Sequence, residues 1–311
     1  MKKSPELGVL ALGINYVRKR LKRRFILHFS TIYPDFYADF CCKADKCQHT
    51  CCAGWEIDID PSTVAKYQQL EGALGGKIRQ NIVEIDGVWQ FRLGEGDRCP
   101  FLREDGLCEL IRTADESILC DICTNHPRFF VTLGDYELAG VGLSCEKSCE
   151  LLLADTAPLG FQLENGEKMS LNELLQRLSL PADDEDLCYQ AGLTVDDAAF
   201  VLDCLQKTEP IDAEWTAQLA RLRSEQFAVG VEVLQVFDRI YQYILYRALE
   251  HVPQYGWGTV LSYAQLNADF IYLMYCFTGQ LGESIRRWSE QIEYSTENVQ
   301  ILLEALSAGG A

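Results

Sequence analysis

Cysteine is the residue type in this sequence whose number and spacing point most directly to chemistry. The stretch FCCKADKCQHTCCAGW (40–55) contains five of the fourteen cysteines, and eleven of them lie between Cys41 and Cys149. Thiolates are soft ligands that select zinc, copper(I) or iron–sulfur clusters. The sequence therefore predicts a metal-binding module in the first half of the chain.

The spacing of the thiols leaves the identity of the metal open. Cys47-x3-Cys51 and Cys120-x2-Cys123 each have the spacing of a zinc knuckle. Three further cysteines do not pair in this way: Cys99, Cys108 and Cys145. Iron–sulfur clusters tolerate more dispersed ligands, because a cluster is wider than a single ion. Spacing alone thus allows zinc or an iron–sulfur cluster, in one four-ligand site or in two.

Composition and charge restrict the class of protein. The chain has 311 residues, of which 48% are hydrophobic, as in a globular protein. Its net charge of −18 argues against a nucleic-acid partner. No stretch approaches eighteen uninterrupted apolar residues, so we predict a cytoplasmic protein without a transmembrane segment. In that reducing compartment, the cysteines are not expected to form a disulfide framework.

The first thirty residues differ from the rest in charge. Residues 1–30 carry eight Lys and Arg side chains against one Glu, around the apolar stretch LGVLALGINYV. This stretch is too short to span a bilayer, and no small-residue cleavage site follows it. We interpret residues 1–30 as a basic extension capable at most of weak contact with a membrane surface.

Hydrophobic patterns predict an α+β fold that is mainly α. A cysteine-rich metal module with small hairpins is expected at residues 31–155, followed by a helical bundle in a helical domain at residues 165–311. Asp86–Gly87 and Gly134–Asp135 mark two hairpin turns between apolar arms. Asp60–Pro61 has the residue types that begin a helix.

The second half contains clear helix signals. Ser170 and Glu173 have the spacing of a capping box. Apolar residues recur at helical spacing between Phe237 and Leu249, which predicts a helix with one buried face.

Three other residues near the thiols are candidates for a role in the site. Trp55 could cover a metal site as an apolar lid or act as a substrate platform. Arg128 could hold a carboxylate of a cofactor or form a structural ion pair. His49 lies within the cysteine cluster, as an alternative ligand or a solvated loop residue. No catalytic residue is assigned, because acids and tyrosines are too numerous for one to be singled out as a general base.

Several motifs together resemble those of a known family. PDFYADFCCKADKCQHTCCAGWEIDIDP, CPFLREDGLC, CTNHPR and LSCEKSCELLL occur in the order found in the flagellin lysine-N-methylases, part of a group of cysteine-cluster proteins with a zinc- or iron-chelating domain. The resemblance covers roughly residues 32–306. It implies that eight cysteines are metal ligands: Cys42, Cys47, Cys51, Cys52, Cys99, Cys108, Cys123 and Cys145. Cys41, Cys120 and Cys149 fall outside the family's pattern.

The resemblance also implies an activity. A flagellin lysine-N-methylase transfers methyl groups from S-adenosylmethionine to lysine ε-amines of flagellin. The implied cofactor is an iron–sulfur cluster, [4Fe–4S], with zinc as the alternative, and the implied partner is flagellin. Two non-enzymatic alternatives remain from the residues themselves: a zinc-binding module, and an iron–sulfur module that serves in redox chemistry or sensing.

Overall fold

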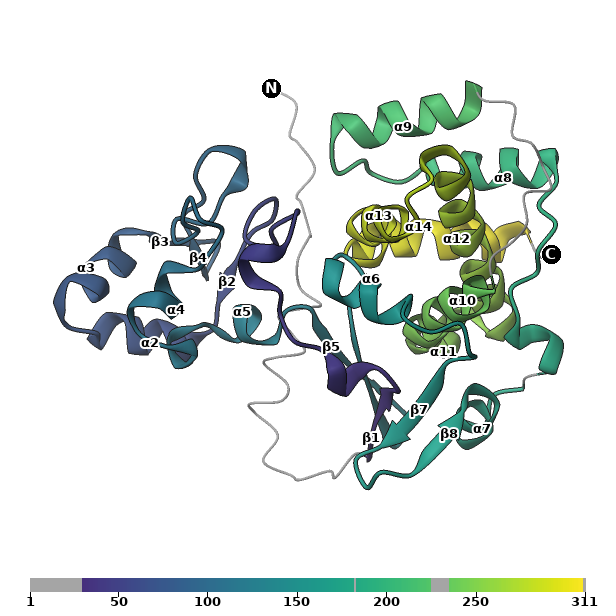
Figure 1. Ribbon diagram of the computed structural model, residues 1–311, viewed down its shortest axis with the longest axis horizontal. Helices are drawn as coiled ribbons and strands as arrows, with labels where there is room; N and C mark the ends of the chain where they lie inside the picture. Colours follow the sequence, from purple (N-terminus) through teal and green to yellow (C-terminus); the bar gives the residue numbers. More distant parts are fainter. Residues whose placement is uncertain (1–29, 182, 225–234, 310–311) are drawn as a thin grey trace, which may run out of the picture.

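The computed structural model describes residues 30–181, 183–224 and 235–309, and it shows an α+β fold that is mainly α, as predicted (Figure 1). The predicted basic extension lies outside the described residues, except for Ser30. Two hydrophobic cores organise these residues, a large one and a small one.

A five-stranded mixed sheet forms one layer of the large core. Its strands, in the order β5-β6-β1-β7-β8, are Arg128–Leu133, Tyr136–Val141, Ser30–Pro34, Gly160–Leu163 and Lys168–Ser170. The β5–β6 pair is the hairpin predicted around Gly134–Asp135. β1 runs parallel to β6 and antiparallel to β7. This pairing brings the start of the described chain to the middle of the sheet, which the sequence patterns did not predict.

Helix α6 and the helices of the second half of the chain share the large core with this sheet (Figure 1). They are α6 Glu146–Leu152, α7 Leu171–Arg177, α8 Val195–Leu205, α9 Ala213–Ser224, α10 Val236–Ala248, α11 Val252–Tyr255, α12 Trp257–Thr278, α13 Leu281–Trp288 and α14 Thr296–Gly309. A π-helical turn, Ser289–Glu293, follows α13. The predicted capping box is present at the start of α7, where the Ser170 side chain accepts a hydrogen bond from the Glu173 N–H.

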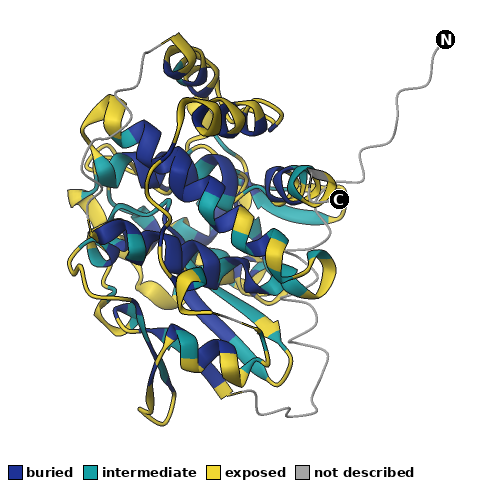
Figure 2. Cartoon of the chain, turned by 90° about the vertical axis from the view of Figure 1, so that its right-hand side faces the viewer, coloured by how far each residue is buried: buried dark blue, intermediate teal, exposed yellow. Residues whose placement is uncertain are grey.

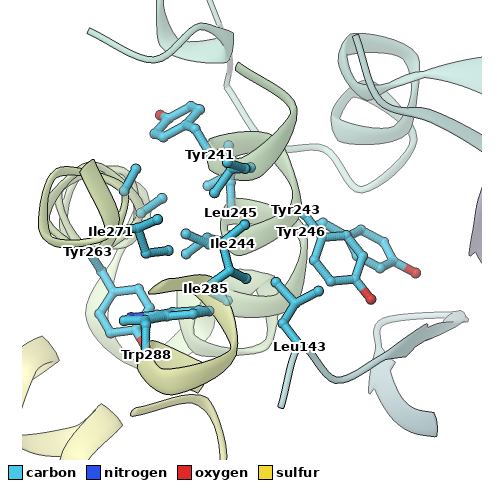
Figure 3. Close-up of a cluster of buried hydrophobic side chains, with 14 of the residues drawn as sticks. Leu143, Tyr241, Tyr243, Ile244, Leu245, Tyr246, Tyr263, Ile271, Ile285 and Trp288 are labelled. Carbon is cyan, nitrogen blue, oxygen red and sulfur yellow. The ribbon is translucent and has the colours of Figure 1, made fainter. Parts of the chain in front are cut away.

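Helix α10 joins the helical layer to the sheet. The Tyr246 hydroxyl lies 2.9 Å from the carbonyl oxygen of Ile32 and 2.8 Å from that of Ala139. Glycine at position 140 allows α10 to lie this close to the sheet. A Cβ atom added at this position would lie only 2.8 Å from the Tyr243 hydroxyl of α10 and 2.4 Å from the Phe129 ring. On its other side α10 packs against α12 and α13, with Ile244 and Leu245 turned toward them (Figure 3). The predicted apolar face of this helix is therefore confirmed. Figure 2 shows that the buried residues of the chain gather on the inner helices and strands, with exposed residues around them.

The small core is built from short elements. Its three-stranded antiparallel sheet has the order β2-β4-β3, with strands Asp58–Ile59, Val88–Phe91 and Ile82–Ile85. Its helices are α2 Pro61–Gln69, α3 Gly72–Gln80, α4 Glu109–Thr113 and α5 Asp121–Asn125. The β3–β4 pair is the hairpin predicted at Asp86–Gly87, where Gly87 adopts a φ of 81°. Asp60 caps α2 as predicted, and it also accepts a 3.0 Å hydrogen bond from the Asp121 N–H of α5.

The two cores divide the chain differently from the predicted domain ranges. The small core, with the partly buried residues packed against it, extends from Cys52 to Cys123, between β1 and β5 in the sequence. β1, β5, β6 and α6 instead share the large core with the helices of the second half. The predicted division near residues 155–165 therefore does not coincide with the division between the cores.

A search of the described residues finds no helix that is both long and apolar enough to cross a membrane.

The buried carboxyl group of Asp269, on α12, holds the loop that precedes α8 against α12. The Tyr189 hydroxyl donates a 2.7 Å hydrogen bond to Asp269, and the Gln265 amide donates another at 2.9 Å. Burial raises the pKa of Asp269 to about 7, despite these two donors. The carboxyl group therefore takes up a proton on folding at mildly acidic pH, since its pKa in an unfolded chain is about 3.9.

We expect this group to make the protein less stable as the pH rises. Its contribution to the free energy of unfolding is fully present below pH ~4 and is lost as the pH rises through ~7, at ~1.4 kcal/mol per pKa unit. Urea unfolding of the wild type and of Asp269→Asn, between pH 4.5 and 7.5, measures the difference. The wild type should lose a few kcal/mol more than the variant over this range. Parallel stability profiles for the two proteins would contradict the assignment.

Candidate functional site

The predicted cysteine ligands gather in two groups of thiols. The first thiol group consists of Cys42, Cys47, Cys51 and Cys145, whose side chains lie close enough to perturb the pKa values of Cys47 and Cys51. The second thiol group consists of Cys52, Cys99, Cys108, Cys120 and Cys123, which perturb one another in the same way. All eight cysteines implied by the family resemblance belong to one of the two groups.

The first thiol group lies at the surface between a loop and α6. Cys42 and Cys51 are exposed, and Cys145 is the residue before the first turn of α6. Glu146 connects α6 to the loop that carries the other three thiols. Its carboxylate accepts a 2.6 Å hydrogen bond from the His49 N–H and forms an ion pair with Lys43 at 3.0 Å. Burial, together with the nearby charges of Glu146 and the other thiols, raises the pKa of Cys47 to about 11.

The second thiol group lies within the small core. Cys99 and Cys120 are buried, and the other three pack against the same core. A 2.9 Å hydrogen bond from the Cys99 N–H to the Cys52 carbonyl holds two of the segments together. Burial raises the pKa of Cys99 to about 11. Cys120 and Cys123 lie within one turn of α5, and a hydrogen bond between their thiols lowers the pKa of Cys120 and raises that of Cys123.

The two groups meet at the adjacent residues Cys51 and Cys52. A hydrogen bond from the Cys51 thiol lowers the pKa of Cys52 to about 7, and the Arg98 guanidinium lowers it as well. The same hydrogen bond raises the pKa of Cys51. One side chain of the pair therefore belongs with the exposed thiols and the other with the buried ones.

The thiols fit a soft metal or an iron–sulfur cluster in kind and number, but they do not form a completed coordination sphere. Among the described residues, no three Cys, His, Asp or Glu side chains are placed closely enough to hold one metal ion. Within each group, however, the charge of neighbouring thiolates raises the pKa of other thiols, such as Cys47 in the first group and Cys123 in the second. A bound cation would offset this repulsion and keep several thiols deprotonated, which is how metals bind cysteine clusters.

Trp55 and His126 lie where the two cores come together. The Trp55 indole donates a 2.9 Å hydrogen bond to the Cys51 carbonyl, and its ring stacks on His126 with the centroids 5.8 Å apart. His126 in turn lies 6.1 Å from the ring of Tyr294, which follows the π-helical turn. Trp55 thus covers the backbone of the Cys51–Cys52 pair and connects it, through His126, to the helical body.

The two remaining candidates make other contacts. Arg128, on β5, places its guanidinium 4.9 Å from the centroid of the Phe40 ring. His49 lies 3.5 Å from Glu283 of α13. Neither contact assigns a ligand or cofactor role to these side chains.

The sequence indicates one further feature of the site only in part, and another not at all. The Cys120-x2-Cys123 spacing predicts that these two thiols lie together, whereas the family's pattern leaves Cys120 out; the structure includes Cys120 in the second thiol group. A charged cleft of about 470 Å³ also lies beside the first thiol group, between the loop 48–50 and helices α9 and α13. Its side chains come from segments far apart in the sequence, and no local pattern could have joined them.

The fold and its thiols define a cysteine-rich α+β protein with two adjacent thiol groups. Over 162 residues, 50% of its length, the chain is 28% identical to the flagellar biosynthetic protein FliU of Salmonella muenchen, of which 95% is covered. Over 128 residues, 39% of its length, it is 28% identical to the lysine-N-methylases of Salmonella choleraesuis (strain SC-B67) and Salmonella typhimurium (strain LT2). The matched part amounts to 32% of each of these two relatives, about a third of their length.

No family model and no solved structure matches the chain. The curated relatives nevertheless confirm the resemblance that the motifs predict: the chain resembles a flagellin lysine-N-methylase-like family.

We expect thiols of both groups to be needed for metal binding, with different effects on folding. Cys47→Ala should lose metal and leave the small core folded, because Cys47 lies outside that core. Cys123→Ala should lose metal and also unfold the small core, since metal binding and folding are coupled for buried thiol sites. Elemental analysis and circular dichroism of anaerobically purified protein measure the two effects. The exposed Cys188, changed to Ala, is the matched control and should retain the full metal content. Full metal in either test variant would refute its place in the ligand set.

His126 provides a second test of the site. Burial lowers its pKa to about 4, and its Nε2 atom is buried without a hydrogen-bond partner among the described residues. The contribution of His126 to the free energy of unfolding should therefore fall as the pH drops below ~6.5, by ~2 kcal/mol at pH 5, whereas Asp269 contributes in the opposite direction over this range. His126→Phe keeps a ring between Trp55 and Tyr294 and removes this titration. Between pH 7.5 and pH 5, chemical unfolding should show the stability of the wild type falling by ~2 kcal/mol relative to that of the variant. An equal change in both proteins would show that His126 titrates as an ordinary exposed histidine.

Proposed function

We propose that this chain is a protein-lysine N-methyltransferase that transfers methyl groups from S-adenosylmethionine to lysine ε-amines of flagellin, in the cytoplasm. The names of its relatives, lysine-N-methylase and flagellar biosynthetic protein, support the reaction and its connection with flagella. The structural observation that carries the proposal is the first thiol group, which gathers four cysteines at the surface beside a charged cleft.

The two thiol groups suit different roles because they differ in burial. A cofactor that takes part in the reaction must be reached by its reactants, and only the first thiol group includes exposed cysteines. We assign the iron–sulfur cluster, [4Fe–4S], to this group: Cys42, Cys47, Cys51 and Cys145. When bound, such a cluster would supply a binding point for the amine and carboxylate of the methionine part of S-adenosylmethionine.

The second thiol group suits a structural metal, zinc or iron. Its cysteines line the small core, whose strands have two to four residues and whose helices have five to nine. Elements this short bury little apolar surface, and a metal held between them would supply the missing stabilisation.

The reaction sets requirements that the residues of the chain must meet. The lysine ammonium must first lose a proton, because only the neutral amine attacks, and its ordinary pKa is ~10.4. The amine nitrogen then forms a bond to the methyl carbon as the carbon–sulfur bond breaks, and the sulfonium leaves as a neutral thioether. The amine must lie in line with the methyl group at ~3–3.5 Å. The chain must therefore hold a lysine side chain at a fixed position close to the first thiol group.

The direct test is transfer of a labelled methyl group to flagellin. Anaerobically purified protein is incubated with flagellin and methyl-labelled S-adenosylmethionine, and mass spectrometry locates the label. We expect label on lysine ε-amines with the wild type, and at least a hundredfold less with Cys42→Ser. Cys41→Ser is the matched control, because Cys41 is exposed, adjacent in sequence and absent from both thiol groups; it should retain the activity. No labelled lysine from wild type that carries an intact cluster would refute the proposed function.

A further inference from the structure

Cys145 differs from the other three members of the first thiol group, which lie on the loop 40–55. It directly precedes the first turn of α6, in the helical body. The residues 141–143, which lead toward it from β6, are all buried. The contacts of this segment therefore decide where the Cys145 thiol lies relative to the loop.

The backbone of the segment 141–143 is held at successive residues. The Tyr243 hydroxyl of α10 lies 2.8 Å from the Val141 nitrogen and 2.6 Å from the Val141 carbonyl oxygen. The Gly142 N–H donates a 2.7 Å hydrogen bond to the Pro127 carbonyl. These contacts fix the segment as far as Gly142, so the approach to Cys145 next depends on Leu143.

The Leu143 N–H is held by a charged group, the carboxylate of Glu293. Glu293 Oε2 accepts this hydrogen bond at 2.9 Å, although the two residues are 150 positions apart in the sequence. The Glu293 side chain is only 4% exposed, and Arg247 Nε lies 3.6 Å from its Oε1 atom. Ser289 Oγ donates a further hydrogen bond to Oε2 at 2.5 Å. A hydrogen bond to a buried carboxylate is stronger than one between neutral groups, so Glu293 fixes the chain two residues before Cys145.

The backbone around Glu293 is unusual. Glu293 is the last residue of the π-helical turn Ser289–Glu293, and such turns are rare and frequently occur at functional sites. The next residue, Tyr294, lies against the same segment, because a Cβ atom added at Gly142 would lie 2.0 Å from the Tyr294 hydroxyl. The turn therefore places two consecutive side chains on the chain that leads to Cys145.

We propose that Glu293 is a positioning residue of the first thiol group: it fixes Leu143 and thereby holds Cys145 where a metal can bind it. The inference rests on the proposed function, which assigns a cluster to this group. Groups that orient a metal ligand from behind change metal affinity by roughly 10- to 100-fold when they are replaced. Glu293 acts through the backbone and does not itself bind the metal.

The rate at which each metal is lost to a chelator tests this role. Anaerobically purified wild type and Glu293→Ala are incubated with EDTA and followed by native mass spectrometry. We expect Glu293→Ala to lose the metal of the first thiol group about tenfold faster than the wild type, and that of the second thiol group at the wild-type rate. Glu293→Gln keeps an oxygen acceptor for the Leu143 N–H and should restore most of the retention.

Asp269→Ala is the matched control for general destabilisation. It removes another buried, hydrogen-bonded carboxyl group from the large core, on α12. It should lower the melting temperature and leave the metal of the first thiol group as firmly held as in the wild type. Loss of this metal from Asp269→Ala as fast as from Glu293→Ala would reduce Glu293 to an ordinary core residue and overturn the proposal.

Hydrogen–deuterium exchange of the wild type gives a test that does not require a variant to fold. The Leu143 amide should exchange slowly, because it donates to a buried carboxylate. Exchange at the rate of an exposed loop, or equal metal loss from the wild type and Glu293→Ala, would overturn the proposal. If the wild type then still carries the metal of the first thiol group and methylates flagellin, the proposed function stands and only the role of Glu293 is wrong. A wild type without metal in this group would overturn both.

Discussion

The peptide bond that joins Cys51 to Cys52 is the constraint on which the arrangement of the site depends. The two residues are adjacent in the sequence, yet one belongs to the exposed thiol group and the other to the buried one. The small core is thereby joined to the first thiol group through a single peptide unit, which Trp55 covers by its hydrogen bond to the Cys51 carbonyl.

The helical body completes the site from the other side. α6 contributes Cys145, and its Glu146 holds the loop of the first thiol group through Lys43 and the His49 N–H. α9 and α13 then close the charged cleft against the same loop. The large core keeps these helices in place, because α10 contacts both the sheet and the helices behind it. The small core, the loop and the helical body thus each supply a part of the site that the others lack.

Local features of this fold could be predicted from the sequence, and contacts between distant segments could not. Asp86–Gly87 specifies its hairpin and Ser170–Glu173 its helix start, because turn and cap geometry depend on neighbouring residues. The parallel pairing of β1 with β6 depends instead on a segment about a hundred residues away, and β1 carries no local signal for it. For the same reason, spacing could not show that Cys51 and Cys52 belong to different groups or that α9 and α13 lie beside the loop 48–50. Arg286 pairs with Glu283 and Glu290, which are three and four residues away on the same helical surface. This spacing is common on any exposed helix, so it does not indicate a cleft.

The claim that two thiol groups meet at one pair of residues is tested most directly by native mass spectrometry of two single variants. Anaerobically purified Cys51→Ser and Cys52→Ser are each compared with the wild type for the masses of their bound metals and clusters. The account predicts that the wild type carries two separate bound species. Cys51→Ser should then lose the species held by the exposed thiols, and Cys52→Ser the species held by the small core. Loss of the same species from both variants would contradict the account, because Cys51 and Cys52 would then serve a single site.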